Sequence, residues 1–209
     1  MNEERRIVIL FSSGFDSTLL LADAIKNSSP DVIVSAVVID NSLTIKHQLE
    51  REHENQLLIL RTLRKSFPDR QIEYQRIKID SNWKVGHRAN ASGCLVQPLL
   101  WICNILPMLH EGDIVRIGYN SEDQAVRYQT ELKNLWNAAT AIQNDKNVKL
   151  EFPLITLTKA QVLERVFTEY DYLIEYITSC EGFYMKDKPC GRCIPCNNLK
   201  KALLTVGLM

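Results

Sequence analysis

Mostly apolar runs alternate along the chain with longer segments in which apolar residues recur at helical spacing. Five of the apolar runs predict strands, at 5–11, 31–40, 71–79, 113–120 and 148–154. The first two contain few polar residues, which is typical of strands buried on both faces of a parallel sheet. Helical spacing predicts helices between and after them, at 16–27, 44–67, 95–109, 128–144 and 158–170. This alternation predicts an α/β protein with a doubly wound parallel sheet.

Local signals predict where several of these helices begin and end. Asp16 or Ser17 could cap the start of the first helix, and Thr158 that of the helix at 158–170. Pro68 ends the long polar helix. His53, on that helix among many charged residues, is expected on a solvated face. A short helix at 197–204 should pack the end of the chain back onto the body.

Composition narrows the class of protein. The 209 residues fit one domain of moderate size with a small appendage, and 45% of them are hydrophobic. The 25 basic and 25 acidic residues give a net charge of zero, which argues against a strongly basic nucleic-acid binder. No apolar run is long enough to span a bilayer, and no signal peptide is visible, so the cytoplasm is the expected compartment.

The first predicted strand ends abruptly in a turn of small residues, Ser12-Ser13-Gly14-Phe15-Asp16-Ser17. At the carboxyl end of a parallel strand, backbone N–H groups and the start of the next helix together attract phosphate. The serine hydroxyls add donors, Gly14 allows a positive φ and close approach, and Asp16 could hold a loop amide or magnesium. The alternative is an ordinary strand-to-helix turn. The turn matches neither the Walker loop nor the dinucleotide fingerprint.

The end of the chain is rich in cysteine. Four thiolates suffice for a closed tetrahedral zinc site, and they are provided by Cys180, Cys190, Cys193 and Cys196. An iron–sulfur cluster and four unliganded thiols are the alternatives. Cys103, on a predicted helix, is expected in the core, and Trp136 is expected in the core or at an interface.

Taken together, these motifs resemble a known family. Besides the loop at 12–17, they comprise Asp40 with a downstream Lys-His-x-x-Glu stretch at 46–50, Gly118 with Asp123, a Pro-Leu pair followed by Lys159, and the Thr-Ser-Cys and Cys-Gly-x-Cys-x-x-Cys ending at 178–196. In this combination the chain resembles the PP-loop ATP pyrophosphatases of the QueC type, the 7-cyano-7-deazaguanine synthases. The resemblance covers nearly the whole chain.

The resemblance implies a PP-loop fold, similar to the adenine nucleotide alpha hydrolases, over 1–169, and a helical zinc-binding region over 170–209. It implies an ATP-dependent ligase that adenylates the carboxylate of a 7-carboxy-7-deazaguanine, releases pyrophosphate, and uses ammonia to form the amide and then the nitrile. Cofactors would be ATP, Mg²⁺ and Zn²⁺. Asp16, Ser17 and Lys159 would be catalytic. The ATP-binding residues would be Ser12, Ser13, Gly14, Asp16, Ser17, Asp40 and Gly118.

Departures from the family pattern concentrate in segments associated with the second substrate. The Pro-Gly/Ala-Arg-Asn stretch expected before the central helix is absent at 92–98, and 123–128 replaces a Tyr-Pro-Asp-Cys element. Candidate substrate-binding residues are His47, His87, Arg88, Asp123 and Arg127. The alternatives are a relative that stops at the amide or transfers the acyl group to an amine of a protein or nucleic acid, a sister activity such as tRNA thiolation, and a nucleotide-binding module without turnover. A homodimer is a further possible assembly.

Overall fold

The structure is a computed structural model that describes residues 6–41, 46–79, 96–143, 147–178, 180 and 189–207. Its centre is a sheet in which every pair of neighbouring strands is parallel. The strands are β1 (Arg6–Leu10), β2 (Ile33–Asn41), β3 (Gln71–Ile79), β4 (Ile114–Arg116) and β5 (Lys149–Glu151). They follow the order β3-β2-β1-β4-β5, which confirms the predicted doubly wound sheet.

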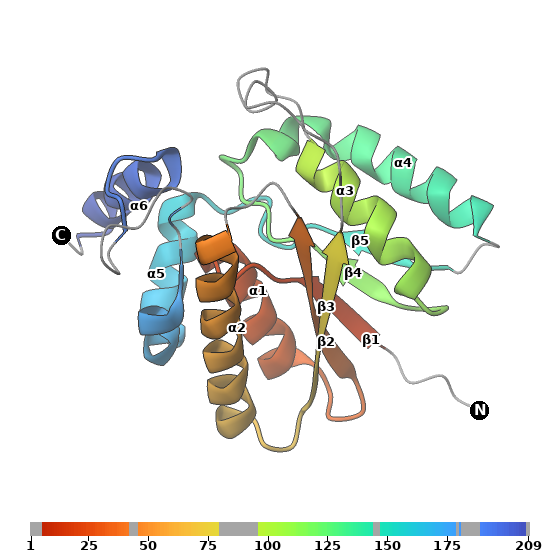
Figure 1. The fold of residues 1–209 in the computed structure, drawn as a ribbon, viewed down its shortest axis with the longest axis horizontal. Coiled ribbons are helices and arrows are strands. Elements are labelled where there is room, and N and C mark those ends of the chain that lie inside the picture. Colours follow the sequence, from red (N-terminus) through yellow and green to blue (C-terminus); the bar gives the residue numbers. More distant parts are fainter. Residues whose placement is uncertain are drawn as a thin grey trace.

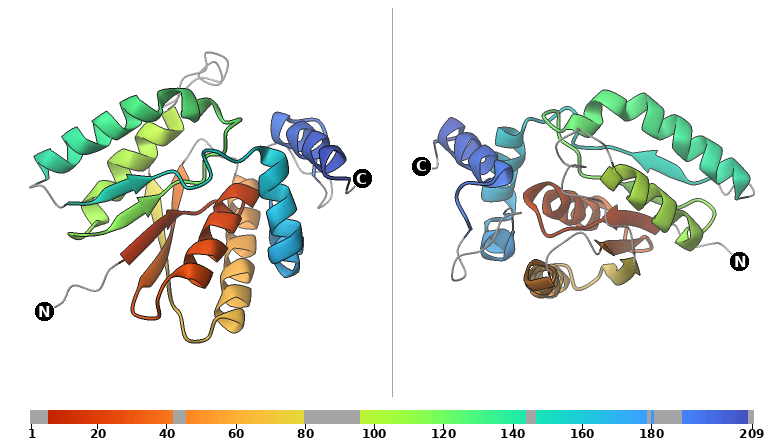
Figure 2. Two further views of the ribbon diagram at one scale, coloured as in Figure 1. Left: turned by 180° about the vertical axis from the view of Figure 1, so that it is seen from behind. Right: turned by 45° about the horizontal axis from the view of Figure 1, so that its top comes forward.

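Helices cover both faces of the sheet and make three layers (Figures 1 and 2). Alternate residues of β1 point to opposite faces, since Ile7 and Ile9 belong to one apolar cluster and Val8 and Leu10 to the other. The first cluster is completed by α1 (Phe15–Asn27), α2 (Lys46–Ser66) and α5 (Lys159–Glu169). The second is completed by α3 (Val96–Ile105) and α4 (Gln129–Ile142).

Several predicted elements are shorter than expected. The helix predicted at 95–109 ends as an α-helix at Ile105 and continues as a 3-10 turn, η1 (Leu106–Met108), because Pro107 lacks the N–H that would continue the helix. The strand predicted at 113–120 ends at Arg116. A further 3-10 turn, η2 (Gln124–Tyr128), leads directly into α4. Within the described ranges, no helix combines the length and apolar character needed to cross a membrane.

The last part of the chain packs on the same core as the sheet. After α5, the 3-10 turn η3 (Asp171–Tyr176) and α6 (Ile194–Thr205) contribute Leu173 and Ala202 to the cluster that contains α1 and α2. The division predicted between 169 and 170 coincides with the end of α5 and remains a prediction about domains.

Two expectations about core residues have different outcomes. Trp136 is 1% exposed, and its indole N–H donates to the carbonyl of Val148 at 3.0 Å, so its core position is confirmed. Cys103 was expected in the core, but it is exposed, because Ile102 and Ile105 supply the buried face of α3.

Candidate functional site

The order of the strands places the candidate loop where a ligand site is expected. The chain order reverses on either side of β1, because β2 lies on one side of it and β4 on the other. In open parallel sheets, ligands bind outside the carboxyl ends of the strands at such a switch point. The loop at 12–14 leaves β1 at this point and leads directly into α1.

Hydrogen bonds among its serines fold the loop onto the start of α1. The Ser12 N–H donates to Ser17 Oγ at 3.2 Å, and the two hydroxyl oxygens lie 3.1 Å apart. Ser17 Oγ in turn donates to the carbonyl of Gly14 at 3.3 Å. The helix begins at Phe15 with Gly14 as its N-cap and no side-chain capping bond, so the prediction that Asp16 or Ser17 caps it is wrong. Both residues already lie in the first helical turn.

The positive φ in the loop belongs to Ser13 and not to Gly14. Ser13 has φ 59°, whereas Gly14 has φ −76° and ψ 165°, an extended conformation open to any residue. Gly14 therefore does not use the positive φ that a glycine allows, and Ser13 adopts it instead. Ser13 is fully buried, and among the described residues its hydroxyl has no hydrogen-bond partner.

Gly118, just beyond β4, allows a close approach between the segment after this strand and the first turn of α1. A Cβ on Gly118 would lie 3.1 Å from the carbonyl carbon of Asp16, 3.2 Å from its oxygen and 3.2 Å from the N of Ser17. All three are backbone atoms of the first turn of α1, so any side chain here would push that turn away. The position therefore favours glycine, because the backbone of α1 leaves little room for a Cβ.

Both carboxylate oxygens of Asp16 are held by side chains from elsewhere in the chain. Lys159, the first residue of α5, forms an ion pair with one oxygen. The side-chain amide of Asn120 donates to the other at 3.0 Å. The side chains of Asp16 and Lys159 are each about one-fifth exposed, so the pair borders solvent. The structure therefore brings together two of the three predicted catalytic residues, with Ser17 on the same turn.

Asn120 was not among the residues predicted from the sequence. It is 3% exposed and organises the turn after β4, where its backbone N–H donates to Asp123 Oδ2 at 2.8 Å and its Oδ1 accepts from the Glu122 N–H at 2.9 Å. Burial raises the pKa of Asp123. The Glu122 carboxylate accepts from the Lys159 backbone N–H at 3.2 Å. Asp123 thus reaches the Asp16–Lys159 pair through one intervening residue.

Asp40, near the end of β2, forms an ion pair with Arg76 on β3. His53 was expected on a solvated face, but it is only partly exposed, because its ring stacks on Tyr74 and its Nδ1 lies 3.0 Å from the Tyr74 hydroxyl. Burial, followed by the positive charge of Arg76, lowers the pKa of His53.

Of the remaining predicted substrate residues, the structure describes the side chain of Arg127 alone. Arg127 is exposed on η2. His47 belongs to α2, but its side chain lies outside the described part of the structure, as do His87 and Arg88 entirely. Their roles remain predictions.

The four cysteines converge. The sulfur atoms of Cys180, Cys190, Cys193 and Cys196 all lie within 4.8 Å of one another. A tetrahedral zinc ion with Zn–S bonds of about 2.3 Å needs sulfur atoms about 3.8 Å apart, so this arrangement fits such an ion with little adjustment. Cys180 and Cys196 are buried, and the other two are partly exposed. The four cysteines therefore form a candidate metal site.

Backbone groups prepare this cluster for a cation. The N–H of Cys193 donates to the Cys190 sulfur at 3.3 Å, and that of Cys190 to the Cys180 sulfur at 3.3 Å. Hydrogen bonds from the backbone of Arg192 and Cys193 lower the pKa of Cys190 to about 6, whereas burial raises that of Cys196 to about 12. A cation would supply the charge that stabilises all four sulfurs as thiolates.

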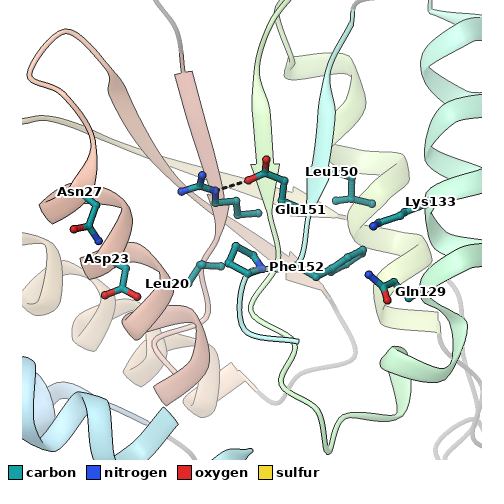
Figure 3. Close-up of a pocket in the computed structure, with 10 residues that line it drawn as sticks. Leu20, Asp23, Asn27, Gln129, Lys133, Leu150, Glu151 and Phe152 are labelled. Carbon is teal, nitrogen blue, oxygen red and sulfur yellow. Dashed lines mark hydrogen bonds and ion pairs between the residues drawn. The ribbon is translucent and has the colours of Figure 1, made fainter. Parts of the chain in front are cut away.

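A groove of about 480 Å³ lies elsewhere on the molecule (Figure 3). It is lined by α1, β4, β5 and α4, and includes Asp23, Lys133 and the ion pair between Arg116 and Glu151. None of the predicted site residues lines it. The groove also lacks the loop amides and the convergent hydrogen bonds that distinguish the region around Asp16.

The parallel sheet, its strand order and the loop at the switch point fit a PP-loop α/β fold. The structure of the U34-tRNA thiolase NcsA from Methanococcus maripaludis with its [4Fe-4S] cluster is similar, with a TM-score of 0.52 and 15% identity over 100% of this chain and 67% of that one. NMN synthetase from Francisella tularensis gives a TM-score of 0.47 and 14% identity over 98% and 77%. At these identities, the likeness to the thiolase supports the fold alone.

Within this class, the family model of the Queuosine biosynthesis protein QueC matches residues 110–207. The match includes Gly118, Asp123, Lys159 and all four clustered cysteines. Over these residues the chain is similar to QueC, in line with the resemblance that its motifs carry. No curated protein matches the chain at a significant level.

Proposed function

We propose that this protein is an ATP-dependent ligase of the QueC type, which adenylates the carboxylate of a 7-carboxy-7-deazaguanine. The observation that carries the proposal is the position of Asp16. It follows the loop at the switch point, and Lys159 and Asn120 hold its two oxygens. A lysine, a carboxylate and a turn of small residues at one helix start suit the binding of a polyphosphate with its cation.

In the proposed reaction, the loop amides and Lys159 would stabilise the phosphates of ATP and the departing pyrophosphate. Lys159 would exchange Asp16 for a phosphate oxygen, and Asp16 would become a ligand of Mg²⁺. The substrate carboxylate attacks the α-phosphorus, the bond to the β-phosphate oxygen breaks, and an acyl-adenylate forms. Ammonia then displaces AMP to give the amide, and a second adenylation leads to the nitrile.

The cysteine cluster is proposed to hold zinc in a structural role. Four sulfur ligands complete a tetrahedral site and leave no position for a substrate or a reactive water. Cys180, Cys190, Cys193 and Cys196 would hold the ion, and the region that carries η3 and α6 would gain stability from it. Metal analysis distinguishes zinc from an iron–sulfur cluster.

A second candidate function is favoured by the segment after β4. Where the family has a Tyr-Pro-Asp-Cys element, this chain forms η2 and exposes Arg127 and Tyr128. Because this segment is associated with the second substrate, the change favours a relative that stops at the amide or transfers the acyl group to an amine of a macromolecule.

The nucleotide chemistry can be tested with purified protein, ATP, Mg²⁺, ammonium and 7-carboxy-7-deazaguanine. We expect pyrophosphate and AMP, and a loss of turnover of at least about 100-fold in Asp16→Ala and in Lys159→Ala. Lys159→Ala removes a positive charge beside the developing anion, and Asp16→Ala removes the proposed ligand of Mg²⁺. Lys149→Ala, at an exposed lysine on β5, is the control that should retain activity. Release of ADP and orthophosphate would contradict the proposed reaction.

Mass spectrometry of the same mixtures identifies the product. Conversion to the free nitrile with two ATP consumed supports the synthase. Accumulation of the amide, or a macromolecule that gains the mass of the acyl group, supports the second candidate.

A further inference from the structure

Thr178, between η3 and the cysteine cluster, contacts the candidate nucleotide loop from outside it. Its backbone N–H donates to the carbonyl oxygen of Ser13 at 2.9 Å. Its own carbonyl oxygen lies against Gly14, at 3.6 Å from where a Cβ of that residue would be. Thr178 is 8% exposed, so these contacts are shielded from water. The sequence gives no sign of this approach, because 164 to 165 positions separate the partners.

The bond to Ser13 fixes the part of the loop whose conformation is least favourable. Ser13 has φ 59°, a left-handed conformation that is unfavourable for a non-glycine residue unless its surroundings hold it there. The carbonyl of Ser13 and the N–H of Gly14 belong to one planar trans peptide and point in opposite directions. By holding the Ser13 oxygen, Thr178 therefore directs the Gly14 N–H away from itself.

Thr178 is in turn held from two sides. The side-chain amide of Asn55, on α2, donates to its hydroxyl oxygen. Two positions further along the chain lies Cys180, which is 1% exposed and contributes a sulfur to the cluster of four. Thr178 thus lies between a helix of the main core and the first ligand of the metal site.

We propose that Thr178 is a positioning residue for the nucleotide loop, and that through it the order of the loop depends on the metal bound by the cysteine cluster. A bound ion would fix Cys180, and Cys180 would restrict the position of Thr178 and therefore the Ser13–Gly14 peptide. The proposal rests on the proposed function only where it concerns ATP affinity. The order of the loop can be measured without a nucleotide.

The test compares variants of the metal-loaded, full-length protein by hydrogen exchange of the peptide 11–18 and by ATP affinity with Mg²⁺. Thr178→Val keeps the shape of the side chain but removes the acceptor of the Asn55 bond, whereas Thr178→Ser retains it. We expect Thr178→Val to raise loop exchange and the Kd for ATP about 3- to 10-fold, the range for loss of one hydrogen bond. Thr178→Ser should resemble the wild type.

A matched control is Thr168→Val on α5, because the Thr168 hydroxyl bonds only within its own helix, to the Glu164 and Arg165 carbonyls, among the contacts described. It should leave loop exchange and Kd unchanged. If Thr178→Val does not fold, Asn55→Ala removes the donor of the same bond and should have the same effect. Loop exchange equal to that of the wild type in these variants would overturn the positioning role.

The dependence on metal is tested by removing the ion from the wild-type protein with a chelator. Loop exchange should rise about 3- to 10-fold while the peptide 33–41, which contains β2, stays protected, and the rise should shrink in Thr178→Val. An unchanged loop after metal removal would overturn the dependence on the cluster. If the wild type binds no ATP, the proposed function fails, whereas the exchange measurements still decide this proposal.

Discussion

Gly118→Ala should destabilise the protein and its nucleotide site more than Gly14→Ala, although Gly14 lies in the loop itself. The φ of Gly118 is one that any residue adopts, so the effect is steric. An added Cβ would meet three backbone atoms of Asp16 and Ser17 at 3.1 to 3.2 Å. Backbone atoms cannot rotate away as a side chain can, so the first turn of α1 and β4 must separate by a few tenths of an ångström.

Overpacking of this kind costs about 1–3 kcal/mol. For a chain of this size, a loss of about 2 kcal/mol lowers the melting temperature by about 4–8 °C. Because the atoms that move carry Asp16, we expect ATP turnover to fall at least about 10-fold.

At Gly14, the added Cβ would lie 3.5 Å from Ser12 Oγ and 3.6 Å from the Thr178 carbonyl oxygen, which are ordinary contacts. Alanine is a poorer N-cap than glycine, which destabilises the folded protein. It also lowers the entropy of the unfolded chain, which stabilises the folded protein by about 0.4–1 kcal/mol. These effects offset each other, and the melting temperature should change by less than about 2 °C. Calorimetry of both variants is the measurement. An unchanged melting temperature in Gly118→Ala, or an equal loss in Gly14→Ala, would refute the reasoning.

Two further predictions concern the cysteine cluster and His53. Cys193→Ser should lower the metal content below about one ion per chain and reduce the melting temperature by several degrees. The control Cys103→Ser, at an exposed cysteine outside the cluster, should change neither quantity. Equal melting temperatures of the two variants would show that the cluster is not structural. The pKa of His53 should lie below 6.5 by NMR titration, because burial and Arg76 disfavour its charged form. As the pH falls below 6.5 the unfolded chain takes up this proton first, so stability should fall, and His53→Gln should make that fall smaller; a pKa above 6.5 would contradict this.

The fold could be predicted from the sequence because its signals are local. Short apolar runs alternate with helical segments, and that pattern alone predicts a parallel sheet with helices on both faces. Thr158 is a similar case, since its side chain accepts from the Gln161 N–H at 3.2 Å and the Gln161 side chain accepts from its N–H at 2.8 Å. Both partners of this capping box lie within four residues of sequence, so the sequence alone indicates the cap.

The missed features depend on which segments become neighbours. Asn120 reaches Asp16, 104 positions away, only because β4 pairs with β1. Ser13 adopts the positive φ next to a glycine that does not, and its carbonyl is held by Thr178 from the far end of the chain. Propensity alone assigns the positive φ to the glycine, since tertiary contacts that override it leave no local pattern.

The charges around Asp16 bear on how the proposed nucleotide would bind. Among the described residues of this hydrogen-bonded set, three carboxylates face the one ammonium of Lys159, and they belong to Asp16, Glu122 and Asp123. Burial raises the pKa of Asp123. A polyphosphate entering alone would meet repulsion from Asp16 once Lys159 turned toward it. A divalent cation bridging Asp16 and the phosphates removes that repulsion and leaves Lys159 free to bind phosphate. The same carboxylate that holds Lys159 in place without a nucleotide is therefore the group that makes the proposed site depend on Mg²⁺.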